Sequence, residues 1–205
     1  DSLMATYIGD LNVCSHGYLT YQVAEKLIVD GFPQKKDGFI YTINEYIQAW
    51  QNQSGFHQPD QVDYAKILTD FNIVNKINGG MIDEVWLFGM PFAGFYESLM
   101  VGPAAFFVNA PPLIMSGVQR PFMMMGFNYQ RGIGEMLEAF GHRAEFILMR
   151  TYRNTTGTAN LWERFTRYDK AFPGQAECGT VHFAPNSQTD YDWGNPAFVP
   201  SRCRN

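Results

Sequence analysis

The fold of this chain is constrained most by its short apolar runs, which Gly, Pro and Asp residues interrupt and bound. The runs at 85–88, 105–108 and 122–125 have the length of buried parallel strands. A longer run at 18–29 is rich in β-branched and aromatic residues and also predicts a strand. Because segments with helical spacing separate these runs, we expect an α/β fold with three layers, in which helices flank a mostly parallel sheet.

Apolar residues at helical spacing predict helices that begin near residues 3, 43, 60, 128 and 158. The start at residue 43 is the clearest, because Thr42 and Glu45 have the spacing of a capping box. Asn128 is expected to cap a long helix that runs to about Arg150. The turn-rich remainder, 172–205, predicts an irregular segment that wraps the surface of a single α/β domain spanning residues 1–205.

Charge and hydropathy argue against two classes of partner. The formal net charge of −5 provides no basic surface for a phosphate backbone, so we expect no nucleic-acid partner. No apolar run reaches the roughly 18–20 residues that cross a bilayer, so we expect no membrane span. The residues at both ends of the chain are unlike natural termini, which predicts a fragment of a longer protein.

Cysteines and glycosylation sequons predict an extracellular protein. The three cysteines form no Cys-x-x-Cys pair, which argues against a structural zinc site. A disulfide between Cys178 and Cys203 would stabilise the fold by about 3 kcal/mol, although spacing alone leaves this pairing open. Cys14 is then a free thiol or the partner of a cysteine outside this sequence. Sequons at Asn52 and Asn154 predict a secreted glycoprotein.

Polar residues follow the predicted strands. Ligands of an open parallel sheet bind beyond the carboxyl ends of its strands, which selects three loops, 89–98, 109–116 and 126–131. The first loop contains Glu97, and the third contains Asn128 and Arg131. The predicted helix start in the third loop could dock a carboxylate or another anion. The alternative is an ordinary Asn cap beside a solvated arginine.

Titratable residues concentrate on one face of the predicted long helix. Glu138, His142 and Glu145 are spaced i, i+4 and i+7, opposite an apolar stripe. A carboxylate and an imidazole one turn apart can hold one metal ion, and these donors suit zinc or manganese. His182, shortly after Cys178, could supply a third ligand or a general base. The alternative is a solvated helix face with local charge pairs.

The segment 190–195 alternates Asp with aromatic residues, much as a calcium loop alternates its ligands. Its residue order departs from the EF-hand pattern, so a rigid Asx-turn loop is the alternative. Tyr191 and Trp193 could also stack on a sugar. The sequence contains no nucleophile elbow, P-loop or dinucleotide-binding motif, which argues against hydride and phosphoryl transfer.

Four motifs are similar to those of an uncharacterised family of secreted, mostly bacterial proteins. They are DEVWLFG (83–89), MGFNY (125–129), GHRAE (141–145) and CGTVHFAPN (178–186). The resemblance spans most of the chain from about Tyr21 onward. It implies secretion but no particular reaction, because the family has no established activity.

These features predict a secreted α/β domain that hydrolyses an extracellular glycan or peptide with the help of a divalent ion, either zinc, manganese or calcium. The residues predicted to act are Glu138, His142 and Glu145 as metal ligands, His182 as a further ligand or general base, and Glu97, Asn128 and Arg131 as substrate-orienting residues. The alternative is a non-catalytic extracellular protein, either a carbohydrate binder or a self-assembling subunit of a filament. An aromatic content of 16% and a charged content of 17% suit the broad polar-aromatic contacts of such a protein.

Overall fold

The computed structural model describes residues 2–203 and contains two compact units, Asp1–Ala139 and Phe140–Asn205. The boundary between them falls within helix α5 (Ile133–Tyr152), which is one continuous helix. The single domain expected from the sequence stays a prediction, because compact packing does not show whether either unit folds alone.

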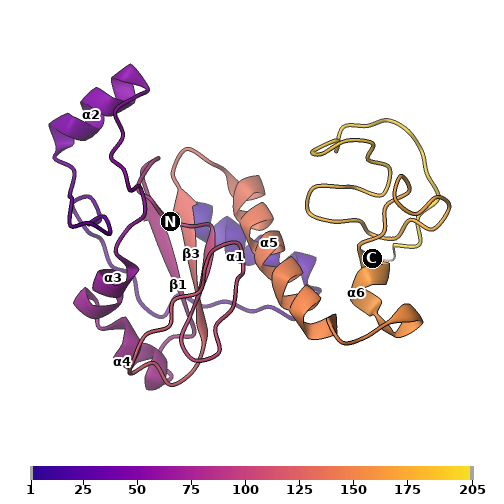
Figure 1. Cartoon of the computed structure of the whole chain (residues 1–205), viewed down its shortest axis with the longest axis horizontal. Coiled ribbons are helices and arrows are strands. Elements are labelled where there is room, and N and C mark those ends of the chain that lie inside the picture. The colour runs from indigo at the N-terminus through magenta and orange to yellow at the C-terminus, as the bar shows by residue number, and fades with distance from the viewer. Residues whose placement is uncertain (1, 204–205) are drawn as a thin grey trace. The chain divides into compact units, whose positions relative to one another are not determined.

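A three-stranded sheet forms the centre of the first unit (Figure 1). Its strands are β1 (Glu84–Gly89), β2 (Ser98–Val101) and β3 (Phe122–Asn128), in the order β1-β3-β2. β1 pairs with β3 in parallel, whereas β2 pairs with β3 antiparallel. The expected three-layer fold with a mostly parallel sheet is therefore wrong, and the chain is an α/β structure with a small mixed sheet.

Two of the predicted strands do not form. Residues 18–29 are irregular, and apolar side chains such as Tyr18 and Ile28 are exposed. Residues 105–108 lie in a loop after β2. The physical reason is that strand-forming composition marks residues that fit a pleated, half-buried surface but does not supply the neighbouring strand that pairing requires. The structure instead forms β2 from four buried residues that begin at Ser98, the end of a predicted binding loop.

Four short helices precede the sheet in the chain: α1 (Ser2–Cys14), α2 (Ile43–Asn52), α3 (Tyr64–Asp70) and α4 (Ile73–Asn78). The predicted capping box of α2 is confirmed, since the Thr42 hydroxyl accepts from the Glu45 amide and the Glu45 carboxylate accepts from the Thr42 amide. The helix expected from about residue 60 begins at Tyr64, because Asp63 caps it by accepting from the Lys66 amide.

The core of the first unit covers both faces of β3. Phe122 and Met124 join a buried cluster with side chains of α3 and α4. Because side chains alternate along a strand, Phe127 points to the other face, where it packs edge-on against the fully buried Tyr7 of α1. In Figure 1, α3 and α4 accordingly lie to one side of β1 and β3, and α1 lies to the other. The loops at the ends of the strands are therefore attached to a sheet that is packed on both faces.

The second unit has little regular structure after α5. It contains a short 3₁₀ turn η1 (Gly157–Ala159) and helix α6 (Leu161–Phe165), and no helix or strand follows α6 up to residue 203. The predicted disulfide between Cys178 and Cys203 is confirmed and closes a ring around part of this irregular segment. Residues 204–205 of the predicted surface segment lie outside the described residues. None of the helices described for residues 2–203 is long and apolar enough to cross a membrane.

Candidate metal centre

The helix that carries the predicted metal ligands begins at Ile133, not at Asn128 as expected. Asn128 ends β3, and its side-chain oxygen accepts a hydrogen bond from the Gln130 amide in the turn between strand and helix. The start of α5 is held by Glu135, whose carboxylate accepts from the Gly132 amide at 2.8 Å. Hydrogen bonds from the amides of Glu135 and Gly132 keep the pKa of the Glu135 carboxyl below its usual range.

The three predicted ligands on α5 lie on a packed face of the helix. The side chains of Glu138, His142 and Glu145 are 14%, 16% and 23% exposed. These low exposures do not fit the alternative of a solvated helix face. We therefore treat the residues as members of a site rather than as surface charges.

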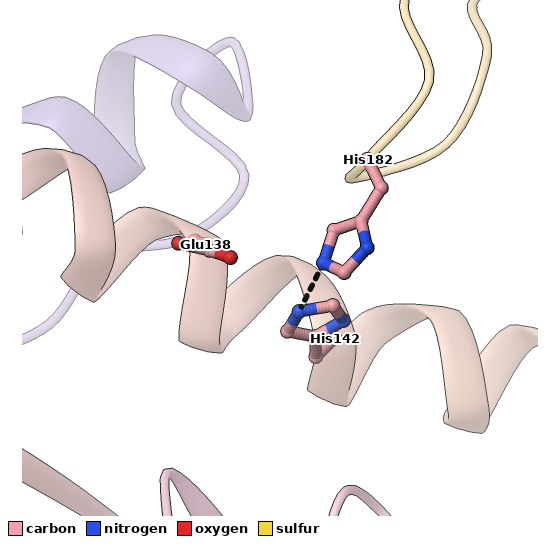
Figure 2. A group of neighbouring side chains, drawn as sticks. All are labelled: Glu138, His142 and His182. Carbon is pink, nitrogen blue, oxygen red and sulfur yellow. Dashed lines mark hydrogen bonds between the residues drawn. The ribbon is translucent and has the colours of Figure 1, made fainter. Parts of the chain in front are cut away.

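His182 approaches α5 from the irregular segment and meets His142 (Figure 2). The Nε2 atoms of the two imidazoles lie 3.1 Å apart. Glu138 lies one turn earlier on α5, and one donor atom from each of the three residues falls within 4.8 Å of the others. We call these three residues the Glu-His-His group. Among the described residues, this is the one group of three or more His, Cys, Asp or Glu side chains whose donor atoms lie close enough together to hold a metal ion.

Each histidine of the group has a carboxylate beside its other ring nitrogen. Glu145 Oε2 lies 3.4 Å from His142 Nδ1, and Asp190 Oδ1 lies 3.1 Å from His182 Nδ1. A carboxylate beside Nδ1 favours the tautomer whose proton is on Nδ1, which leaves a lone pair on Nε2. Two such lone pairs facing each other require a proton or a cation between them. The arrangement therefore presents both imidazoles toward one point, as metal ligation needs.

Gly141 allows the segment around His182 to approach the helix closely. A Cβ atom on Gly141 would lie 2.6 Å from Val181 Cγ2, nearer than real Cβ atoms come to their neighbours. Glu145 holds the same segment from the next turn, since its Oε1 accepts from the Val181 amide at 2.8 Å. Glu145 is thus brought to the site as a positioning residue for His142 and Val181, and not into the Glu-His-His group itself.

The predicted substrate-orienting residues come together in a separate hollow of the first unit. Glu97, Asn128 and Arg131 all line this hollow, whose volume is about 250 Å³. The guanidinium group of Arg131 lies 3.5 Å from the Glu97 carboxylate and 3.6 Å from that of Glu138. Glu97 also accepts a hydrogen bond from the Asn109 side chain at 2.5 Å. Arg131 therefore lies beside two carboxylates of the first unit, those of Glu97 and Glu138.

The two acids of the proposed calcium loop serve different partners. Asp190 faces His182, whereas the Asp192 carboxylate accepts from the Gln188 amide and the Asn195 side chain. Those two bonds hold the pKa of Asp192 below its usual range. This arrangement fits the Asx-turn alternative better than a cage around one cation.

Sequence reasoning missed the contact of Tyr191 with His182 altogether. The Tyr191 hydroxyl lies 2.8 Å from His182 Nε2, across an irregular loop whose path no local pattern predicts. The sequons stay predictions, although both Asn52 and Asn154 are exposed. Cys14 is exposed and forms no disulfide with another described cysteine.

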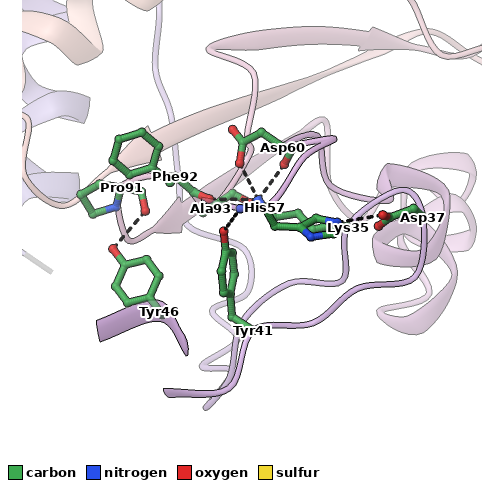
Figure 3. A network of polar contacts seen from close by, with 9 residues as sticks. All are labelled: Lys35, Asp37, Tyr41, Tyr46, His57, Asp60, Pro91, Phe92 and Ala93. Atoms are coloured by element: carbon green, nitrogen blue, oxygen red, sulfur yellow. Dashed lines mark hydrogen bonds and ion pairs between the residues drawn. The ribbon is translucent and has the colours of Figure 1, made fainter. Parts of the chain in front are cut away.

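A second polar cluster, also missed, surrounds the buried Lys35 in the first unit (Figure 3). The Lys35 ammonium donates to the Asp60 carboxylate at 2.7 Å and to three carbonyl oxygens, those of Asp60, Phe92 and Ala93, at 2.6, 2.9 and 2.9 Å. Gly94 permits this approach of loops, because a Cβ there would lie 1.9 Å from the Asp60 carbonyl oxygen. We call these residues the Lys35 cluster. A single lysine between turns carries no sequence signal of such a role.

Comparison with known proteins finds no matching family model, no similar curated protein and no similar solved structure. The resemblance noted from four sequence motifs stays a prediction. Function is therefore inferred from the geometry of the side chains.

Proposed function

We propose that this chain is an extracellular metal-binding protein that holds a divalent ion through Glu138, His142 and His182 and uses it to hydrolyse a glycan or peptide. The observation that carries the proposal is the pair of Nε2 atoms 3.1 Å apart, with a carboxylate beside each Nδ1. Two nitrogens that share one zinc ion, with bonds of about 2.0–2.1 Å, lie roughly 3 Å apart. The spacing of the two imidazoles therefore suits a shared ion.

Zinc is the ion that this donor set suits best. Two imidazoles and one carboxylate form the ligand set of many catalytic zinc sites, which leave a fourth position for water. Glu145 and Asp190 would fix the imidazole tautomers and ring orientations, as carboxylates do around such sites. Calcium, which binds about six to eight oxygen atoms, suits two imidazoles poorly. Manganese remains the second choice, because it prefers more oxygen ligands.

A metal ion in such a site would supply an activated water for hydrolysis. The residues of this chain would then position the substrate. Arg131 lies beside Glu138 and lines the hollow that also contains Glu97 and Asn128, so it would bind a polar or anionic group of the substrate. A disulfide persists in oxidising compartments, which supports the extracellular assignment.

Metal binding is tested first, with His142→Ala and His182→Ala against the native chain. We expect the native protein to retain one zinc ion after dialysis, measured by elemental analysis, and each variant to bind zinc at least about tenfold more weakly by calorimetry. His16→Asn is the matched control, because it removes an exposed histidine that lies outside the group. Unchanged zinc affinity in both alanine variants would refute the site.

Hydrolysis is tested separately on a panel of extracellular polysaccharides and peptides. We expect zinc-dependent release of reducing ends or amines from one substrate class, lost in His142→Ala. Zinc binding without any hydrolysis across the panel would contradict the catalytic part of the proposal and leave the metal site standing.

A structural role for the ion is the second candidate, and one observation favours it. His182 and Asp190 both lie inside the ring closed by the disulfide, where no helix or strand is described. An ion bound there would contribute its binding free energy to the folding of this ring. Zinc that raises the melting temperature but supports no hydrolysis is the result that this candidate predicts.

A further inference from the structure

We infer that Tyr191 is an additional ligand of the proposed metal ion and binds it as a phenolate. The inference rests on the proposed metal site, and a fourth protein ligand favours the structural role of the ion over the hydrolytic one, because a catalytic zinc keeps one position for water. The Tyr191 hydroxyl oxygen lies 2.8 Å from His182 Nε2, which is closer than the 3.1 Å between the two imidazole Nε2 atoms. Both separations match those of atoms that share one ion through bonds of about 2 Å.

Asp190 and Tyr191 hold the His182 ring at both of its nitrogens. Asp190 lies beside Nδ1, and the next residue in the chain places its hydroxyl beside Nε2. The Tyr191 amide also donates to the His182 carbonyl at 3.1 Å, and the two rings lie 4.2 Å apart between centroids. The phenol is therefore tied to His182 by backbone and side chain, so its oxygen remains beside the metal-binding nitrogen.

His182 Nε2 has two polar neighbours but a single hydrogen-bonding position. An imidazole nitrogen offers either one lone pair or one proton. Here Nε2 is within 3.1 Å of both His142 Nε2 and the Tyr191 hydroxyl. One cation can satisfy all three atoms at once, since each would direct a lone pair at it. The phenol oxygen and the imidazole of His142 are thus both neighbours of the nitrogen through which His182 would bind the ion.

Charge supports a phenolate at this point. Glu138 is shared with the Arg131 guanidinium at 3.6 Å, which draws part of its negative charge away from the histidines. A phenolate would add a second negative ligand. The two negative charges of the ligands would then balance the two positive charges of a divalent ion. When the metal–oxygen bond forms, the phenol O–H bond breaks and the proton passes to water, with no change of oxidation state. A phenolate also suits copper(II) and iron(III), which widens the range of ions to examine.

Copper(II) added to the metal-free, full-length protein is the spectroscopic probe. We expect a visible phenolate-to-copper charge-transfer band at one equivalent of copper, and its loss in Tyr191→Phe. The variant should still bind copper, with an affinity reduced by about tenfold. With zinc in place of copper, the ultraviolet difference spectrum near neutral pH should show one ionised tyrosine in the native protein only.

Tyr168→Phe is the matched control, because Tyr168 belongs to the same unit and stacks on Phe183. This control should keep both the band and the affinity. Metal binding by the native protein without a band, and with equal affinity in Tyr191→Phe, would overturn the inference while the Glu-His-His site remained. A native protein that binds neither copper nor zinc would overturn the site and this inference together.

Discussion

Two polar clusters in this molecule bury charged groups in opposite ways. In the Lys35 cluster one ammonium group, which has three hydrogens, is surrounded by four oxygen atoms within 2.9 Å. In the Glu-His-His group two imidazoles direct the same kind of atom at each other, 3.1 Å apart. In the first cluster a donor meets acceptors, whereas in the second two atoms of the same kind face each other.

The difference separates a structural polar cluster from a candidate binding site. A buried charge with all its hydrogen bonds formed fixes the loops that supply them and has no position left for a ligand. Converging acceptors, each oriented by a carboxylate behind it, hold a position for a cation. Burial of a charged group therefore does not by itself indicate a binding site. The direction in which the donor and acceptor atoms point is the better indicator.

The largest effect is expected from Lys35→Met, which tests whether the first cluster is structural. Removing the ammonium leaves the Asp60 carboxylate and three carbonyl oxygens without their donor. We expect the free energy of unfolding to fall by about 3 kcal/mol, the cost typical of breaking a buried ion pair. Urea denaturation measures the change.

Lys66→Met is the control for this experiment, because Lys66 pairs with Asp70 on the surface of α3 at 2.8 Å. An exposed pair of this kind contributes less than about 1 kcal/mol. If both variants lost the same small amount, the Lys35 cluster would not be a structural element of the first unit.

An intermediate effect is expected from Gly141→Ala, which tests whether the second cluster depends on close packing. The added methyl group would meet Val181 at 2.6 Å and displace the segment that carries His182. We expect zinc affinity to fall by about tenfold, as it does when the surroundings of a ligand are disturbed. Calorimetry with zinc gives the affinity.

Gly134→Ala is the matched control in the same helix, because nothing lies within 4 Å of a Cβ at that position. It should stabilise α5 by less than about 1 kcal/mol, because Gly134 lies in the first turn of the helix, and leave zinc affinity unchanged. Equal zinc affinity in the two variants would show that the approach of Val181 does not set the site.

The smallest effect is expected from Asp37→Asn, at the exposed edge of the region around Lys35. Asp37 pairs with His57 at 2.7 Å (Figure 3), and this hydrogen bond, with one from the Phe39 amide, holds the pKa of Asp37 below its usual range. Because the folded-state pKa is the lower one, the contribution is present above the unfolded-state value and disappears as the pH falls through the folded-state value.

Urea midpoints of the native chain and Asp37→Asn should therefore differ slightly near about pH 5 and converge toward about pH 2. Asp30→Asn removes an exposed carboxylate elsewhere and corrects for the change in total charge. A difference between native and Asp37→Asn that grew on acidification would mean that the folded state raises the pKa of Asp37 instead of lowering it.

Local features of the fold were predictable from the sequence, because a few adjacent residues determine them. The capping box at Thr42 and Glu45 and the strand run from Val85 to Phe88 are examples, and both form. Strand pairing was not predictable, because it depends on distant partners. Residues 18–29 have the composition of a strand and find none, whereas β2 forms from a short run beginning at Ser98.

The candidate site likewise has a part that the sequence predicts and a part that it does not. Helical spacing alone brings Glu138 and His142 onto one face, so that part could be predicted. The position of His182 over that face depends on the close approach at Gly141, and the contacts of Asp190 and Tyr191 depend on the path of an irregular loop. No periodicity encodes such a path, which is why these two neighbours were missed.

The disulfide between Cys178 and Cys203 has a consequence for the order in which the protein matures. The ring that it closes contains His182, which lies beside His142, and also Asp190 and Tyr191, which contact His182. While the two thiols are reduced, these groups belong to an open chain end with far more conformational freedom. For the proposed metal site, oxidation of the two thiols would therefore come before metal loading.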